Sequence, residues 1–163
     1  MRLEFSLPFR ARFASVLLYL NAMASVHDVV SYILRKHGPT TAMKLQKLVY
    51  YCQAWSLVWD ERPLFSARIE AWVNGPVVPA LYRIHKGQFR ISEWCGNPDN
   101  LSRTQKETVD AVLRFYGPKT AQWLSDLTHR ERPWQDARSG LKDAERGKSE
   151  ISHASLHEYY SSL

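Results

Sequence analysis

A chain of 163 residues, 45% of them hydrophobic and 23% charged, has the length and composition of one globular domain. Its net charge is +6, yet the basic residues are interspersed with acidic ones and never form a block of five or six. This balance favours a mixed, solvated surface and keeps nucleic-acid binding open as an alternative. No apolar run approaches the length of a membrane span, so no contact with a membrane is expected.

The two cysteines, Cys52 and Cys95, lie in different surroundings and lack the CxxC spacing of a metal or redox motif. This pattern favours free thiols in a reducing compartment and therefore a cytoplasmic protein.

Residues 1–22 differ from the rest of the chain. Three arginines precede a short apolar stretch at 13–20, which small residues follow, in the manner of a weak secretory signal. Two alternatives are a misassigned start, with translation beginning at Met23, and an additional amphipathic helix. We interpret residues 1–22 as an N-terminal extension and residues 23–163 as a single functional domain.

The first predicted helix begins after Ser25, which forms a capping box with Asp28, and ends at Gly38-Pro39. A second, longer helix is predicted after Thr41. Its apolar stripe is made of Leu45, Leu48, Val49, Cys52, Trp55 and Trp59, with Tyr50 and Tyr51 widening it and with Lys44, Lys47 and Gln53 outside it.

The middle of the chain predicts a small β element. Residues 64–73 alternate in part between apolar and polar, as in a short strand. The sequence Asn74-Gly75-Pro76 predicts a turn, because Asn and Gly tolerate positive φ and Pro fixes the next residue. A short helix over 77–85 and a second short strand over 89–94 follow.

Three further helices are predicted in the C-terminal half. Ser102 with Gln105 forms a capping box, Thr120 caps the next helix, and Ser152 caps a last helix through Tyr160. Pro133 interrupts the pattern, and residues 135–145 predict a polar helix or a loop with helical turns. The fold class is therefore α+β and predominantly α-helical: a compact single domain of about six helices with a small antiparallel β element.

Residue patterns for catalysis are missing. The sequence has no GxGxxG, P-loop, GxSxG or HExxH motif. Cys52 lies in an apolar stripe, and His153 and His157 share a helix face without an evident third metal ligand. The weakest hypothesis is a hydrolase using His129 and Glu131. We expect no enzyme activity, no catalytic residues, no cofactor and no metal.

The most distinctive segment is Trp72-Val-Asn-Gly-Pro-Val-Val-Pro79. One glycine and two prolines restrict its backbone, which indicates a rigid corner between strand and helix. Such a corner is either purely structural or a preorganised surface for binding.

Three segments resemble a known family when they are taken in order: Leu45-Gln-Lys-Leu-Val-Tyr-Tyr51, Ala71-Trp-Val-Asn-Gly-Pro-Val-Val-Pro-Ala-Leu-Tyr82 and Leu127-Thr-His-Arg-Glu-Arg-Pro-Trp134. They are similar to the Panacea domain, also called the SocA-like or GepA family of phage-associated proteins. The motif residues that the resemblance marks as structural or toxin-binding are Leu45, Lys47, Leu48, Tyr50, Trp72, Asn74, Gly75, Pro76, Val77, Tyr82, His129, Pro133 and Trp134.

The resemblance implies an antitoxin of a type II toxin–antitoxin system that neutralises a co-encoded toxin by direct protein contact. It also implies a mainly helical domain without catalytic residues or a cofactor. One family member delivers its toxin to a ClpXP-type protease, so a proteolytic adaptor is an alternative, as is a nucleic-acid-binding regulator. The sequence leaves the toxin, its contact face and the oligomeric state open.

Overall fold

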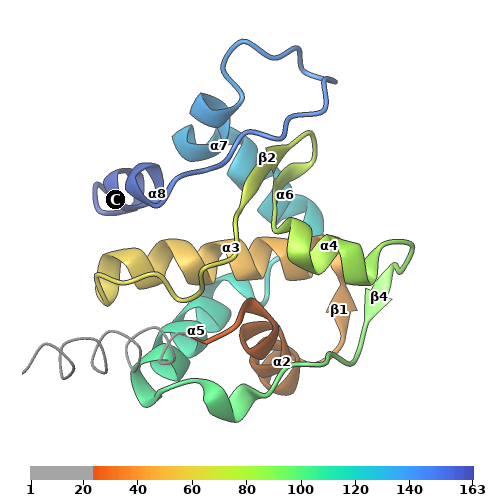
Figure 1. Ribbon diagram of the computed structural model, residues 1–163, viewed down its shortest axis with the longest axis vertical. Helices are drawn as coiled ribbons and strands as arrows, with labels where there is room; N and C mark the ends of the chain where they lie inside the picture. The colour runs from red at the N-terminus through yellow and green to blue at the C-terminus, as the bar shows by residue number, and fades with distance from the viewer. Residues whose placement is uncertain (1–23) are drawn as a thin grey trace, which may run out of the picture.

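The computed structural model describes residues 24–163, and the predictions for residues 1–22 lie outside this range. Seven α-helices occur in the described part (Figure 1): α2 Val26–His37, α3 Ala42–Trp59, α4 Pro79–His85, α5 Arg103–Tyr116, α6 Ala121–Arg130, α7 Arg132–Ala137 and α8 His153–Tyr160. A single 3-10 turn, η1, spans Pro98–Asn100. No helix in this part of the chain is long and apolar enough to cross a membrane. The predicted α+β, mostly helical class is confirmed.

Within residues 24–163, four short strands form two antiparallel pairs. Strand β1 (Thr40–Thr41) pairs with β4 (Arg90–Ile91), and β2 (Glu70–Trp72) pairs with β3 (Gly75–Val77). Within the second pair Trp72 lies opposite Gly75, which makes β2 and β3 a tight hairpin. The predicted small antiparallel element is therefore present as two separate ribbons.

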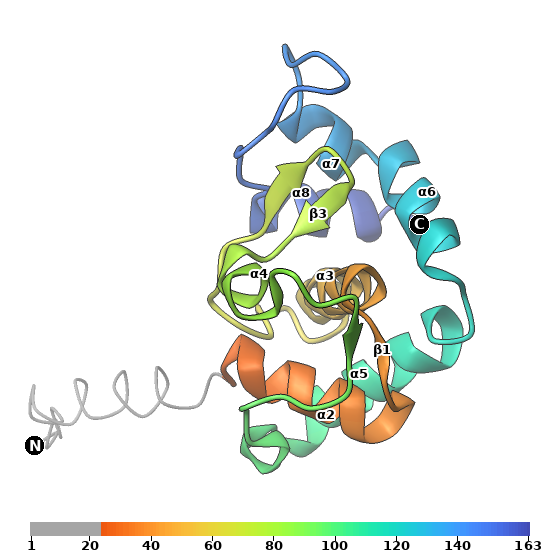
Figure 2. The ribbon, with the colours of Figure 1, turned by 90° about the vertical axis from the view of Figure 1, so that its right-hand side faces the viewer.

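Helix α3 runs through the middle of the molecule, between two layers (Figures 1 and 2). Helices α2 and α5 pack on one side, and α6, α8 and strand β3 pack on the other. Leu45, Leu48 and Val49 have no exposed surface, as their apolar stripe predicts. A helix enclosed on both sides has no wholly solvated face, and this explains why the rest of its surface is also buried.

Lys47 and Gln53, which were predicted to lie outside the apolar stripe, are nevertheless buried. Lys47 is 1% exposed and Gln53 is completely buried. Lys44 is half-buried and donates to the Gly117 carbonyl at 2.6 Å. Periodicity identifies the apolar stripe of a helix. In this protein the β2–β3 hairpin and helix α8 also cover the polar side of α3.

The strand predicted over residues 64–73 is limited to Glu70–Trp72. Gln53 explains the loss at the start of this segment, because its side chain takes the backbone groups of residues 64 and 65 that a partner strand would need. Its Oε1 accepts from the N–H of Leu64 (2.8 Å) and of Phe65 (3.2 Å), and its Nε2 donates to the Phe65 carbonyl (2.9 Å). The strand over 89–94 is likewise limited to Arg90–Ile91, since β1 offers only two residues for pairing.

Helix caps account for most of the boundaries. The capping boxes of Ser25 with Asp28 and of Ser102 with Gln105 are both complete, and Thr120 and Ser152 cap α6 and α8 as predicted. The interruption predicted at Pro133 is present as the break at Glu131 between α6 and α7. Pro133 lies in the first turn of α7, where a missing backbone N–H has no cost. This short helix raises the number above the predicted six.

Candidate functional site

The β2–β3 hairpin brings the three sequence segments together. Its own residues belong to the second segment, α3 beneath it carries the first, and the end of α6 with the start of α7 carries the third. Figure 1 shows the hairpin above α3, between α4 and the α6–α7 pair. Segments that are far apart in the chain therefore build one local structure.

Lys47 supports the hairpin from below. Its Nζ donates to the Pro76 carbonyl at 3.1 Å from a fully enclosed position. Burial lowers the pKa of this amine to about 7, because a charged ammonium loses its hydration there. Gly75 lies directly above it with a φ of +105°, and a Cβ at this position would stand 2.7 Å from Lys47 Cε. The glycine thus allows both the turn and the close approach of the lysine.

Side-chain donors satisfy the carbonyls of the hairpin. Trp134 Nε1 donates to the Trp72 carbonyl at 2.8 Å, and Ser125 Oγ donates to the Asn74 carbonyl at 3.2 Å. Arg138 donates to the Ala71 carbonyl at 3.1 Å and also to the carbonyls of Lys142, Asp143 and Glu145. On its outer side β2 also pairs with residues 149–151, where the Ala71 N–H donates to the Ser149 carbonyl at 2.9 Å and the Ile151 N–H donates to the Ile69 carbonyl at 2.9 Å. Together these bonds hold the short hairpin in one conformation.

Gln46 joins the hairpin to α4. Its Oε1 accepts from the Val78 N–H at 2.8 Å, and its Nε2 donates to the Val78 carbonyl at 3.3 Å and contacts His85 Nε2 at 2.9 Å. Because the amide nitrogen is the donor, the ring nitrogen of His85 acts as acceptor. Burial lowers the pKa of His85, which agrees with a neutral ring.

A pocket of about 380 Å³ opens between α3, the hairpin and α4. Five of the predicted motif residues line it: Lys47, Trp72, Asn74, Val77 and Tyr82. Trp72 and Tyr82 meet edge to face, with ring centroids 4.8 Å apart. A concave site with aromatic walls and a few polar groups has the general form of a binding site.

The other motif residues lie elsewhere or serve the core. Leu45, Leu48 and Tyr50 are completely buried in α3, and Pro133 is buried at the start of α7. His129 packs against Trp134, with ring centroids 4.3 Å apart, and its Nε2 is buried without a hydrogen-bond partner among the described residues. Burial, and then the nearby Lys47 amine, lower the pKa of His129. These motif residues support the hairpin or fill the core, and they do not line the pocket.

Glu131, which the sequence analysis named only in the hydrolase hypothesis, binds α8 through a buried carboxylate. Glu131 is 4% exposed and accepts from the hydroxyls of Tyr160 (2.6 Å) and Tyr51 (3.2 Å). The Tyr50 and Tyr160 hydroxyls lie 3.1 Å apart, and because Tyr160 gives its proton to Glu131, Tyr50 supplies the proton of this second bond. Burial raises the pKa of Glu131 to about 7.

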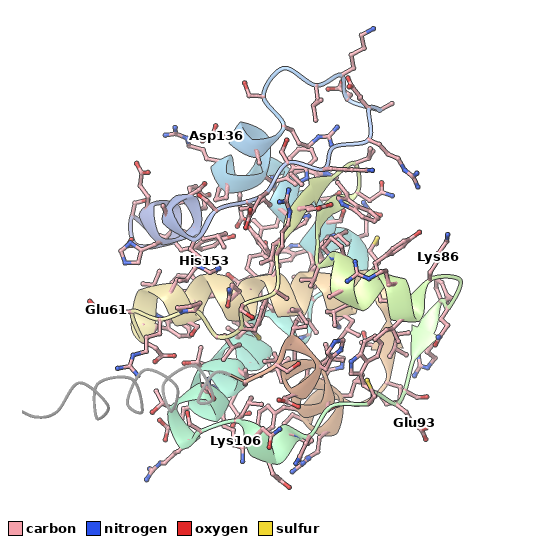
Figure 3. All side chains as sticks on the ribbon, in the orientation of Figure 1. Glu61, Lys86, Glu93, Lys106, Asp136 and His153 are labelled. Carbon is pink, nitrogen blue, oxygen red and sulfur yellow. The ribbon has the colours of Figure 1, made fainter. Side chains whose placement is uncertain are left out.

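The two histidines of α8 do not meet other ligating groups. His153 Nε2 lies 3.0 Å from Gln53 Nε2, which attaches α8 to α3 (Figure 3). Within residues 24–163 no group of three potential ligands is placed to hold a metal ion. Cys52 is buried and Cys95 is exposed, both as free thiols.

Sequence reasoning missed Gln46, Gln53 and Arg138, which hold loop and hairpin backbone. Two of them had a detectable signal: Gln46 is a polar residue inside the first motif segment, and Gln53 repeats that position seven residues later. Arg138 had none, because a single arginine in a polar stretch resembles a solvated side chain.

We expect that Trp134→Phe destabilises the protein by about 1–3 kcal/mol, because the phenyl ring cannot donate to the Trp72 carbonyl, which then loses its donor. Chemical denaturation measures the change. Trp123→Phe is the matched control: Trp123 is partly buried on α6, and its indole N–H has no hydrogen bond to a described residue. Equal losses in the two variants would show that ring volume, not the hydrogen bond, matters.

Comparison with known proteins finds one family whose match covers all three segments. Residues 45–135 match the family described as Antitoxin SocA-like, Panacea domain. Antitoxin SocA of Caulobacter vibrioides (strain NA1000 / CB15N) is 32% identical over 116 residues, which are 63% of this chain and 62% of that protein. The match thus covers less than two thirds of the length of this relative. No solved structure matches the chain. Because the family match extends over more than half of the sequence and includes the hairpin and most of its supports, this chain belongs to the SocA-like, Panacea-domain antitoxin family.

Proposed function

We propose that this protein is an antitoxin that neutralises a co-encoded toxin in the cytoplasm by direct protein contact, as in type II systems. The observation that carries the proposal is the convergence of the family segments on one braced hairpin with a pocket beside it. A surface fixed in advance loses little conformational entropy when a partner binds. The family match and the name of the Caulobacter relative support the antitoxin role.

We further propose that the chain has no catalytic activity of its own. The buried ionisable groups of the described residues each have a structural use: Lys47 binds the hairpin carbonyl, and Glu131 binds the tyrosine hydroxyls. Burial raises the pKa of the Cys52 thiol, which makes it a poor nucleophile. His129 lies beside Trp134, with no carboxylate among its hydrogen-bond partners, so the hydrolase alternative lacks support.

The test is a growth assay in cells that express the adjacent open reading frame from an inducible promoter. We expect that this expression arrests growth and that this protein, expressed in the same cells, restores it. A version of the gene without its start codon is the matched control, since it keeps the transcript but makes no protein. A harmless neighbour, or rescue by the untranslated transcript, would refute the proposal.

The same cells separate neutralisation from delivery to a protease. For direct neutralisation we expect the toxin to remain as abundant in rescued cells that contain a ClpXP-type protease as in cells that lack it. Loss of the toxin only where the protease is present would assign this protein the adaptor role instead.

A further inference from the structure

All charged side chains that line the pocket between α3, the hairpin and α4 are basic. Lys47 lies at its floor, and Lys86 and Arg146 lie at its edge, while no Asp or Glu is among the residues that line it. Neither Lys86 nor Arg146 forms an ion pair with any residue of the described range. Two exposed cations without a local counter-charge attract a negatively charged group, and an anion beside Lys47 would favour its protonated form.

The floor of the pocket has unused hydrogen-bonding capacity. In its protonated form Lys47 has three N–H donors, and the Pro76 carbonyl accepts from one of them. His85, which also lines the pocket, already accepts from Gln46. A carboxylate that reached Lys47 would therefore gain a charge-assisted hydrogen bond without displacing the bond that holds the hairpin.

The walls of the pocket are mainly apolar. Trp72 and Tyr82 meet edge to face on one side, and Met43 and Val77 contribute aliphatic surface. A volume of about 380 Å³ is at the small end of ligand sites, and it accommodates a large side chain together with a neighbouring one. The pocket thus suits an acidic group that is attached to apolar surface, and it does not suit an isolated ion.

Exposed apolar side chains lie at the edge of the pocket and beside it. Phe89 is 82% exposed, and Met43 at the pocket edge is 36% exposed. The Phe89 carbonyl accepts from the Ala42 N–H at 2.9 Å, which places Phe89 beside the same end of α3 that bears Met43. Large apolar groups held in place around a pocket are typical of contact sites for proteins.

We propose that this pocket receives an acidic anchor of the toxin, an aspartate or glutamate side chain next to a large apolar side chain, with Met43 and Phe89 contacting the toxin beside it. The inference rests on the proposed function and gives its contact face and chemistry. A nucleic acid fits less well, because phosphates bind open rows of Lys and Arg, whereas apolar walls enclose this site.

The test uses the full chain and the purified product of the adjacent open reading frame, with the dissociation constant measured by calorimetry at roughly 50 mM and roughly 300 mM salt. The variant Lys86→Glu/Arg146→Glu reverses both exposed charges at the pocket. The control Lys106→Glu/Arg114→Glu makes the same change in net charge on α5, which lies across α3 from α4 (Figure 3). Lys86, Arg114 and Arg146 are exposed and Lys106 is partly exposed, so thermal melting should show a folded protein in each case.

We expect the pocket variant to raise the dissociation constant at least about tenfold at low salt, with a smaller effect at high salt, and the control to leave it within about twofold. Equal weakening by both variants, or by neither, would overturn the inference while growth rescue by the unchanged protein left the proposed function standing. Absence of binding by the unchanged protein would overturn both. Tight binding of a DNA duplex that the pocket variant alone abolishes would assign the surface to nucleic acid and overturn the inference.

Discussion

Gly75→Val is expected to destabilise the protein by about 3–5 kcal/mol, a large share of the stability of an ordinary domain. A β-branched residue is strained at a φ of +105°, at a cost of about 1–3 kcal/mol. Its Cβ would also lie 2.7 Å from Lys47 Cε and 3.0 Å from Thr128 Oγ1. Lys47 is enclosed and cannot move aside without losing its bond to Pro76, which adds about 1–3 kcal/mol. Denaturant unfolding measures the loss.

Gly140→Val is the matched control for this prediction. Gly140 has a φ of +84°, and a Cβ there meets no atom within 4 Å, so this variant carries the backbone strain without the collision. We therefore expect it to lose clearly less stability than Gly75→Val. Equal losses would mean that the close approach of Lys47 to the hairpin is not important. If the Gly75→Val protein is stable but no longer neutralises the toxin, the main role of the hairpin is contact with the toxin and not stabilisation of the fold.

Glu131→Gln is expected to stabilise the protein at about pH 8 by up to about 3 kcal/mol. The pKa of Glu131 is about 7 in the folded protein against an ordinary value of 4.5, so the folded state binds more protons than the unfolded state between these values. The ionised carboxylate therefore costs stability above pH 7, and this cost disappears as the pH falls toward 4.5. Glutamine still accepts from Tyr51 and Tyr160 and carries no charge to bury.

The measurement is the difference in unfolding free energy between the variant and the unchanged protein across this pH range. The difference is needed because the pKa values of His85 and His129 are also lowered in the folded protein. Protonation of these two histidines reduces the unfolding free energy of the protein on acidification, in a pH range that overlaps with the titration of Glu131. We expect the advantage of Glu131→Gln to shrink steadily from about pH 8 toward pH 4.5. A difference that stays constant with pH would show that Glu131 titrates normally in the folded protein.

Local signals predicted the helices well. The capping boxes at Ser25 and Ser102 placed the starts of α2 and α5, because a cap is decided by residues three apart. The strands were predicted less well, since their length depends on partners far away in the chain. Strand β4 ends after two residues because β1 has only two, and Gln53 prevents residues 64 and 65 from pairing.

The site was predicted in part. The segments around Tyr50, Gly75 and Trp134 were found by resemblance, and the structure places the last two at one hairpin. Which side of these segments lines a pocket could not be predicted, because it depends on α4 and Arg146, which no spacing connects to Lys47. The burial of Gln46 could not be predicted from periodicity either, because it depends on Val78 and His85, which are far away in the sequence.

Hydrogen–deuterium exchange of this protein, alone and with the product of the adjacent open reading frame, tests the central claim most directly. Binding of a toxin at the pocket should slow exchange in the turn at residues 73–74 and in the exposed segment 86–90, while α5 on the other side of α3 stays unchanged. Protection confined to α2 or α5, or no protection in any segment, would contradict the account of this protein as an antitoxin that binds through the braced hairpin and its pocket.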